Sequence, residues 1–231
     1  MTAPSSTPLS RLVERQMRNW ELAKAQQVDS PVSREQVVHH FITISRQAGS
    51  GGGEVAALLG ERLSWPVFDR NILQVMAEDD NVRRNLYESM DENDRNWVHE
   101  FAQSLFANEL PLNDYFSRLS KTMLTVVRQG PAVILGRGGS LILPSDCGLR
   151  VRIVAPLEYR VTRLTSKSEV SISRATAILC ETDEKRDQFV RSHFNVDPED
   201  QYQYDLIINM ERTSPGAAAD IIATASRARF K

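Results

Sequence analysis

The sequence predicts a doubly wound α/β domain with a mainly parallel sheet of about five strands. Short apolar runs alternate with helical patterns along most of the chain. One run, Ala132–Leu135, is apolar throughout, as expected for a strand that is buried on both faces of a parallel sheet. Ligands of such folds bind at the carboxyl ends of the strands, so functional side chains are expected there.

The composition indicates a globular protein without a global basic field. The chain has 231 residues, of which 41% are hydrophobic and 25% charged, and its net charge is -2. We therefore expect no specific nucleic-acid binding. Cys147 and Cys180 have neither metal-site nor disulfide spacing, which suits a reducing cytoplasm. The sequence has no apolar segment of membrane-spanning length and no signal pattern, so a cytoplasmic protein without membrane contact is expected.

The chain divides into an N-terminal segment, 1–36, and a main domain, 37–231. The first residues are rich in Ser, Thr and Pro, and apolar residues then recur at helical spacing, which predicts a helix from about Ser10 to Gln27. One interpretation is that this helix packs on the main domain. The alternative is that it forms a homodimer or binds a partner.

The stretch from Phe41 to Gly60 joins a β-prone run to a helix through a glycine-rich turn. Free N–H groups and the positive dipole end of a helix attract phosphate, and glycine lets the backbone curl closely around it. We interpret the turn as a nucleotide-phosphate loop; the alternative is a flexible turn without a ligand. The residues of the turn are Gly49, Ser50, Gly51, Gly52 and Gly53.

The turn lacks the lysine of the usual phosphate-loop pattern, GxxxxGK[ST]. When the turn is aligned with this pattern through the following Val55 and Ala56, Gly52 occupies the lysine position and Gly53 follows it. The pattern therefore predicts the backbone cradle without its ammonium group.

Further strands and helices follow the turn in alternation. The polar run from Glu78 to Asn81 is expected to break one helix, and Ser214 is expected to cap the last one. The remaining expected strands are 65–69, 132–135, 149–154 and 204–208, and the expected helices are 71–77, 94–129 with an interruption near Pro111, 157–166, 171–193 and 215–229.

Several arginines are candidates for stabilising transferred phosphate, because a guanidinium stays charged and grips phosphate with two N–H groups. Arg137 lies between glycines directly after a buried strand, which favours a functional role over a solvated surface charge. Arg160 and Arg163 are three residues apart, so both can face one site. The other candidates are Arg46, Arg186 and Arg191.

Two carboxylates near strand ends have open interpretations. Asp69 could bind a substrate sugar or base, could help to place Mg²⁺ through water, or could cap the following helix. Glu54 lies in the first turn of a helix, where the dipole favours a carboxylate, and helix support is the preferred interpretation.

The motifs in their order resemble the cytidylate kinase-like family, over about Phe41 to Ile222. The matching segments are ISRQ at 44–47, GSGG at 49–52, FD at 68–69, ILGRG at 134–138, DEKR at 183–186, FNVDP at 194–198 and YDLIIN at 204–209. The resemblance implies a three-layer P-loop kinase-like fold, with a helical insert at about 70–129 and a lid at about 160–200. It implies phosphoryl transfer from ATP, with Mg²⁺, to CMP or dCMP.

By position, the resemblance assigns the donor phosphates to the turn, Gly49 to Gly53. It assigns the acceptor nucleotide to Asp69 and Arg137, the transferred phosphate to Arg160 and Arg163, and the lid arginines to Arg186 and Arg191. Cytidylate kinases have lysine in the turn, so we hypothesise that Arg46 or a lid arginine supplies the charge here. The alternative function is a catalytically weak or inactive nucleotide-binding regulatory module.

Overall fold

The computed structural model describes residues 38–88, 90–106 and 114–230, and a sheet of five parallel strands lies at its centre. The strand order is β2-β3-β1-β4-β5, which confirms the predicted α/β class and the number of strands. β1 is central, with β3 and β4 as its parallel neighbours. The bounds are Phe41–Arg46 for β1, Val67–Phe68 for β2, Ala132–Leu135 for β3, Gly148–Val154 for β4 and Leu206–Asn209 for β5.

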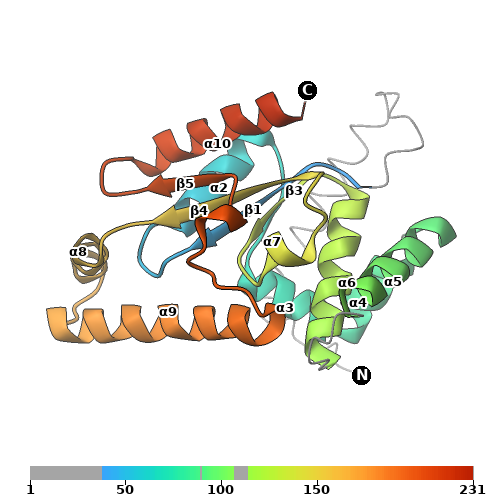
Figure 1. Cartoon of the computed structure of the whole chain (residues 1–231), viewed down its shortest axis with the longest axis horizontal. Helices are drawn as coiled ribbons and strands as arrows, with labels where there is room; N and C mark the ends of the chain where they lie inside the picture. Colours follow the sequence, from blue (N-terminus) through green and yellow to red (C-terminus); the bar gives the residue numbers. More distant parts are fainter. Residues whose placement is uncertain (1–37, 89, 107–113, 231) are drawn as a thin grey trace, which may run out of the picture.

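Helices cover both faces of the sheet and complete a three-layer α/β fold (Figure 1). α2 and α10 lie on one face, and α7 and α9 lie on the other. None of the described helices is both long and apolar enough to cross a membrane. The bounds are Gly52–Leu63 (α2), Arg70–Glu78 (α3), Asp80–Glu88 (α4), Glu92–Phe106 (α5), Asp114–Gln129 (α6), Gly139–Ile142 (α7), Leu157–Lys167 (α8), Ile172–Phe194 (α9) and Pro215–Arg229 (α10).

Strand periodicity sorts the side chains of β1 between two hydrophobic cores. Ile42 and Ile44 are fully buried against α2 and α10, whereas Phe41 packs in the core that helices α3 to α6 share. Thr43 is also buried, and Ser45 is half-buried, on the α7–α9 face. The polar side chains of the central strand therefore face the side of the sheet on which the cavity described below lies.

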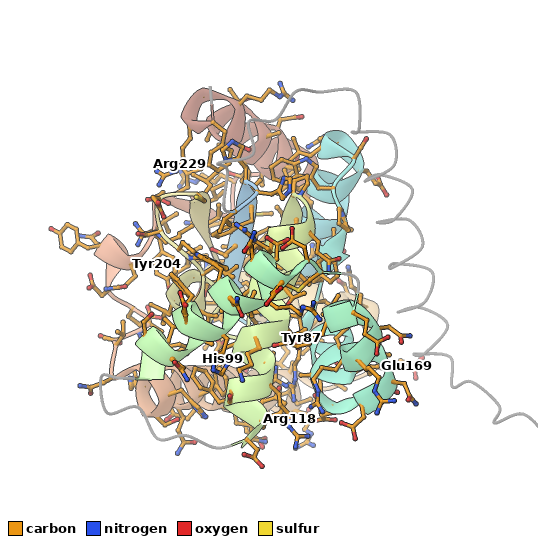
Figure 2. All side chains as sticks on the ribbon, turned by 90° about the vertical axis from the view of Figure 1, so that its right-hand side faces the viewer. Tyr87, His99, Arg118, Glu169, Tyr204 and Arg229 are labelled. Carbon is orange, nitrogen blue, oxygen red and sulfur yellow. The ribbon has the colours of Figure 1, made fainter. Side chains whose placement is uncertain are left out.

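Helices α3 to α6 occupy much of the range 70–129, for which the sequence analysis predicts a helical insert (Figure 2). Tyr87, His99 and Arg118 mark α4, α5 and α6 in that view. The predicted break between α3 and α4 is confirmed: Asp79 ends α3 and accepts the N–H groups of Asn81 and Val82. The domain boundaries themselves stay predictions, and the helix expected at 10–27 lies outside the described residues.

Two element boundaries differ from the sequence prediction for local reasons. Gly52 and Gly53 belong to the first turn of α2, so the loop itself is Gln47 to Gly51. Tyr204 and Asp205 precede β5 rather than beginning it, and Asp205 exchanges backbone and side-chain hydrogen bonds with Arg150 of β4. The predicted cap of α10 is confirmed, because the Ser214 hydroxyl accepts the N–H of Ala217.

Candidate active site

The glycine-rich turn leads from β1 into α2 and leaves the first N–H groups of the helix unpaired. Gly49 and Gly51 have φ angles of 75° and 92°, in the left-handed region that glycine adopts without a Cβ clash. The N–H groups of Gly52, Gly53 and Glu54 have no acceptor among the described residues. Free N–H groups at the positive end of the helix dipole form an anion-binding arrangement.

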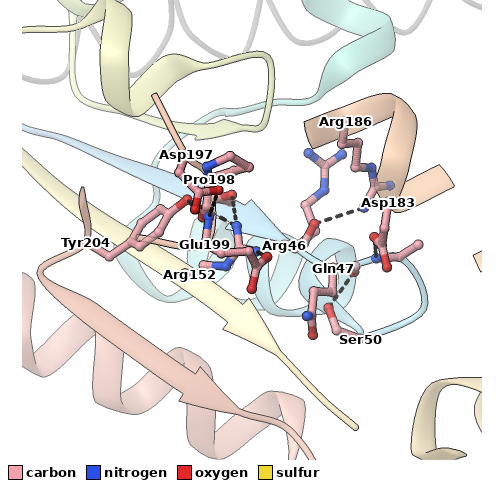
Figure 3. Close-up of polar contacts among 12 residues, drawn as sticks. Arg46, Gln47, Ser50, Arg152, Asp183, Arg186, Asp197, Pro198, Glu199 and Tyr204 are labelled. Atoms are coloured by element: carbon pink, nitrogen blue, oxygen red, sulfur yellow. Dashed lines mark hydrogen bonds and ion pairs between the residues drawn. The ribbon is translucent and has the colours of Figure 1, made fainter. Parts of the chain in front are cut away.

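Helices α8 and α9 hold the turn from outside through three side chains. Asp183 accepts the N–H of Ala48 at 2.6 Å and pairs with Arg160 at 2.5 Å. Arg160 also donates to the Ala48 carbonyl at 3.1 Å and is 8% exposed. Arg186 donates to the carbonyl of Arg46 at 3.0 Å (Figure 3). Arg160 thus supports the backbone of the turn and does not line the cavity described next.

A cavity of about 430 Å³ opens beside the turn, where β1 and β3 end, and continues along the α9 side of the sheet. Its lining is strongly cationic: Asp187 is the one carboxylate residue among the described residues that line it. The basic residues of the lining are Arg46, Arg70, Arg137, Arg152, Lys185 and Arg186.

Four of these cations lack a carboxylate partner in the described part of the chain. Arg152 pairs with Glu199, and Lys185 pairs with Glu181. The four unpaired guanidiniums belong to Arg46, Arg70, Arg137 and Arg186. We call these four the guanidinium cluster; mutual repulsion in the cluster would be relieved by a bound anion.

Arg46 is the most strongly perturbed member of the guanidinium cluster. Its guanidinium lies against Gly136, where a Cβ would fall 1.9 Å from Nη1. Burial, with further repulsion from Arg186, lowers the pKa of Arg46 to about 10, and the nearby Asp69 carboxylate opposes this shift. A half-buried, unpaired guanidinium is costly, so its position favours a negatively charged ligand in the cavity.

Arg137 is held in place by side chains from three helices. Its backbone is left-handed, with φ of 56°, and its guanidinium lies 5.7 Å from the Tyr115 ring and 5.6 Å from the Phe189 ring. Nη2 donates to Gln74 Oε1 at 3.2 Å. The next residue, Gly138, has φ of 69°, and a Cβ there would lie 2.5 Å from the Phe194 ring. Helices α3, α6 and α9 together preorganise Arg137 towards the cavity.

The opposite wall of the cavity is a satisfied polar network around Arg152. This guanidinium is buried and donates to Ser45, Tyr204 and Glu199 (Figure 3). Tyr204 Oη in turn donates to the Pro198 carbonyl at 2.9 Å. Since Arg152 already has a counter-ion, this wall is better suited to neutral polar groups than to a second phosphate.

The structure brings some predicted residues together and places others elsewhere. Arg46, Arg137 and Arg186 line one cavity, whereas Gly49 to Gly53 lie beside it. Asp69 caps α3, since Oδ1 accepts the N–H groups of Asn71 and Ile72. Its negative charge also favours the charged form of Arg46. Arg191 pairs with Asp197 on the surface. The roles of all these residues in binding or catalysis stay predictions.

Arg70, Arg152 and Lys185 line the cavity but were not singled out from the sequence. Arg70 follows Asp69 at the carboxyl end of β2, so its position beside a strand end was a usable signal. Lys185 directly precedes Arg186 on α9. Arg152 alternates with apolar residues in β4, which indicates one face of a strand but not what covers that face.

The residues present fit nucleotide phosphates better than they fit a protein-held metal. The unpaired N–H groups of Gly52 and Gly53 suit phosphate oxygens, as does the guanidinium cluster. No three His, Cys, Asp or Glu side chains gather as a metal site within the described ranges. Mg²⁺ commonly keeps several waters and binds substrate phosphates with one or two carboxylates, a mode that Asp69 could serve.

A profile of the cytidylate kinase-like family matches residues 41–212. The chain belongs to the cytidylate kinase-like family. Cytidylate kinase of Natronomonas pharaonis is 25% identical over 191 residues, which cover 81% of this chain and 90% of that protein. A nucleotide kinase-like function, with the general use of nucleotide and Mg²⁺, follows from this membership.

Two further similarities have a narrower meaning. The crystal structure of an uncharacterized protein from Eubacterium ventriosum has a TM-score of 0.66 and 21% identity, and covers 82% of this chain and 99% of that chain. This similarity concerns the fold alone. Uronate isomerase of Corynebacterium glutamicum is 31% identical over 105 residues, which are 45% of this chain but only 20% of that protein.

Proposed function

We propose that the protein is a nucleoside-monophosphate kinase that transfers a phosphoryl group from ATP to CMP or dCMP, giving ADP and CDP or dCDP. The observation that carries the proposal is the guanidinium cluster beside the glycine-rich turn. The donor and acceptor phosphates of such a reaction must lie next to each other, which the position of the guanidinium cluster beside the glycine-rich turn supports.

The acceptor phosphate is assigned to the guanidinium cluster. Arg137, fixed by Tyr115, Phe189 and Gln74, provides a preorganised grip on the phosphate. Arg46 becomes less costly to keep charged once a dianion is bound beside it. The sugar and base are assigned to the polar wall around Arg152, and cytidine is the default because of the relatives.

The donor phosphates are assigned to the N–H groups of Gly52, Gly53 and Glu54. When bound, MgATP supplies the γ-phosphoryl group: an acceptor phosphate oxygen bonds to the γ phosphorus as the bond to the β–γ bridging oxygen breaks. The guanidinium groups of Arg46 and Arg186 line the cavity beside the glycine-rich turn, where they can neutralise charge that builds up on the transferred group.

An ADP-release assay with CMP, dCMP, UMP, AMP and GMP tests this function. CMP or dCMP should give the highest kcat/KM, and Arg137→Gln should lower it by about a hundredfold or more, as the loss of a transition-state charge contact does. Arg83→Gln is a control, because Arg83 pairs with Asp80 on the surface of α4. Nucleotide binding without transfer to any monophosphate would favour the regulatory-module alternative.

A further inference from the structure

The glycine-rich turn has no cationic side chain of its own at the lysine position, but helix α8 brings two cations to it. A Cβ on Gly51 would lie 3.3 Å from Nη2 and 3.4 Å from Cζ of Arg163. Lys167, one turn further along α8, reaches the same place. Glu54 joins them: its carboxylate accepts from Arg163 Nη2 and from Lys167 Nζ, each at 2.5 Å.

The missing charge was hypothesised to come from Arg46 or from a lid arginine, Arg186 or Arg191. Arg186 lines the cavity, and Arg191 pairs with Asp197 on the surface. The guanidinium of Arg46 lies against Gly136 and lines the cavity, so it is on the acceptor side of the turn. The guanidinium of Arg163 lies over Gly51, at the start of α2. Arg163 is therefore the arginine placed to contact a donor polyphosphate.

The position of Arg163 is fixed by its neighbour on the same helix. Arg160, three residues earlier, donates to the carbonyls of Ala155 and Ala48 and pairs with Asp183. These buried contacts hold α8 against the turn. Residues three apart on a helix share a face, so anchoring Arg160 also directs Arg163 towards the turn.

We propose that Arg163, assisted by Lys167, supplies the donor-phosphate cation that the turn lacks, and that Glu54 is a placeholder whose carboxylate occupies the position of a phosphate oxygen until nucleotide binds. The proposal rests on the proposed function for the identity of the donor. Two cations and one carboxylate leave a single net positive charge at the turn. Nucleotide phosphate must then compete with the Glu54 carboxylate for the side-chain N–H groups of Arg163 and Lys167.

Binding of ADP, measured by isothermal titration calorimetry with EDTA and again with Mg²⁺, tests this competition. Arg163→Gln should weaken ADP binding by about ten- to a hundredfold, as expected for loss of hydrogen bonds to a charged group. Arg163→Lys should restore part of it. Glu54→Gln should strengthen ADP binding severalfold in EDTA, because the competing charge is removed. In the Glu54→Gln/Arg163→Gln double variant this gain should shrink, because the cation for which Glu54 and phosphate compete is gone.

Matched controls separate this role from a general charge effect. Arg174→Gln on α9 and Glu158→Gln on α8 change exposed residues of the same types, and should leave ADP affinity unchanged. The Glu54 pairs are on the surface, so the variants should keep the melting temperature of the parent protein.

ADP binding and monophosphate phosphorylation together distinguish failure of the Arg163–Glu54 proposal from failure of the kinase proposal. ADP affinity that is unchanged in Arg163→Gln, or weakened in Glu54→Gln with EDTA, overturns the placeholder role. Arg163-dependent ADP binding in a protein that phosphorylates none of the monophosphates supports the placeholder role and removes the kinase proposal. Failure of the parent protein to bind ADP at all overturns both.

Discussion

Asp183 and Arg160 join helices α8 and α9 to the glycine-rich turn through one ion pair, 2.5 Å between Oδ2 and Nη1. The other oxygen of Asp183 accepts the N–H of Ala48, and Arg160 donates to the carbonyl of the same residue. One carboxylate and one guanidinium thus satisfy both polar groups of a single peptide residue. Helix α8, helix α9 and the glycine-rich turn are therefore joined by one network of polar contacts.

The first prediction concerns this network. Asp183→Ala leaves Arg160 buried without a counter-ion, so the free energy of unfolding should fall by about 3–5 kcal/mol. Urea denaturation followed by circular dichroism measures the loss. Glu181→Gln removes an exposed carboxylate from the same helix and should leave the free energy of unfolding nearly unchanged. An equally small effect of Asp183→Ala would show that the pair does not support the turn.

The second prediction follows from the lowered pKa of Arg46. A pKa of about 10, well below the ordinary range of arginine, means that the charge costs stability at every pH below about 10, and that this cost is relieved as pH rises above about 10. Inorganic phosphate should relieve it at neutral pH. At a hundredfold excess over its Kd, phosphate should add about 2.7 kcal/mol. Thermal unfolding with and without phosphate measures this gain.

Arg46→Gln is the matching variant for the phosphate effect. It should unfold at a similar or higher temperature than the parent without phosphate, and should gain less from phosphate. Arg83→Gln, on the surface of α4, should respond to phosphate as the parent does. A full phosphate effect in Arg46→Gln would place the anion elsewhere.

The third prediction concerns the rings that hold Arg137. Phe189→Leu removes one of the two aromatic faces beside the guanidinium and should raise KM for the monophosphate, with kcat/KM lower by about three- to tenfold. KM for ATP should not change. Phe189→Tyr should keep the activity of the parent protein, because it keeps the ring. Steady-state kinetics with each substrate varied in turn measure the split. An equal rise in both KM values would instead indicate a general loss of structure.

The fourth prediction concerns the acid stability of the edge strand. Burial alone would raise the pKa of Asp205, but hydrogen bonds from the Arg150 side chain and N–H hold it below its usual range. The resulting stability is present above the unfolded pKa and is lost as pH falls through the folded one. Asp205→Asn should therefore be less stable than the parent at pH 7, with a smaller further loss towards pH 3. Parallel slopes for both proteins in that range would contradict this.

The main elements could be predicted from the sequence because their signals are local. The apolar run Ala132–Leu135 and the cap at Ser214 depend on neighbouring residues and appear where expected. The candidate site was predicted in part: Arg137 follows a buried strand, and ligands of such folds bind at the carboxyl ends of the strands. Arg46 and Arg186 were chosen for their chemistry and also line the cavity.

The remaining features depend on contacts between distant residues. Arg152 is buried because Glu199 and Tyr204, about fifty positions later, provide its partners. Arg160 looks like a phosphate ligand in the sequence, yet Asp183 and the carbonyl groups of the turn occupy its donors. No periodicity or motif encodes which carboxylate meets which guanidinium across the fold.

Gly138 shows how a residue with no side chain can control the chemistry of its neighbour. The ring of Phe194 fills the space where a Cβ would stand, so the loop after β3 can pass directly beneath the end of α9. Any larger residue would have to push that helix end outward or twist the peptide that carries Arg137. Losses of activity from random mutagenesis should therefore include this position, although it offers no functional group to any ligand.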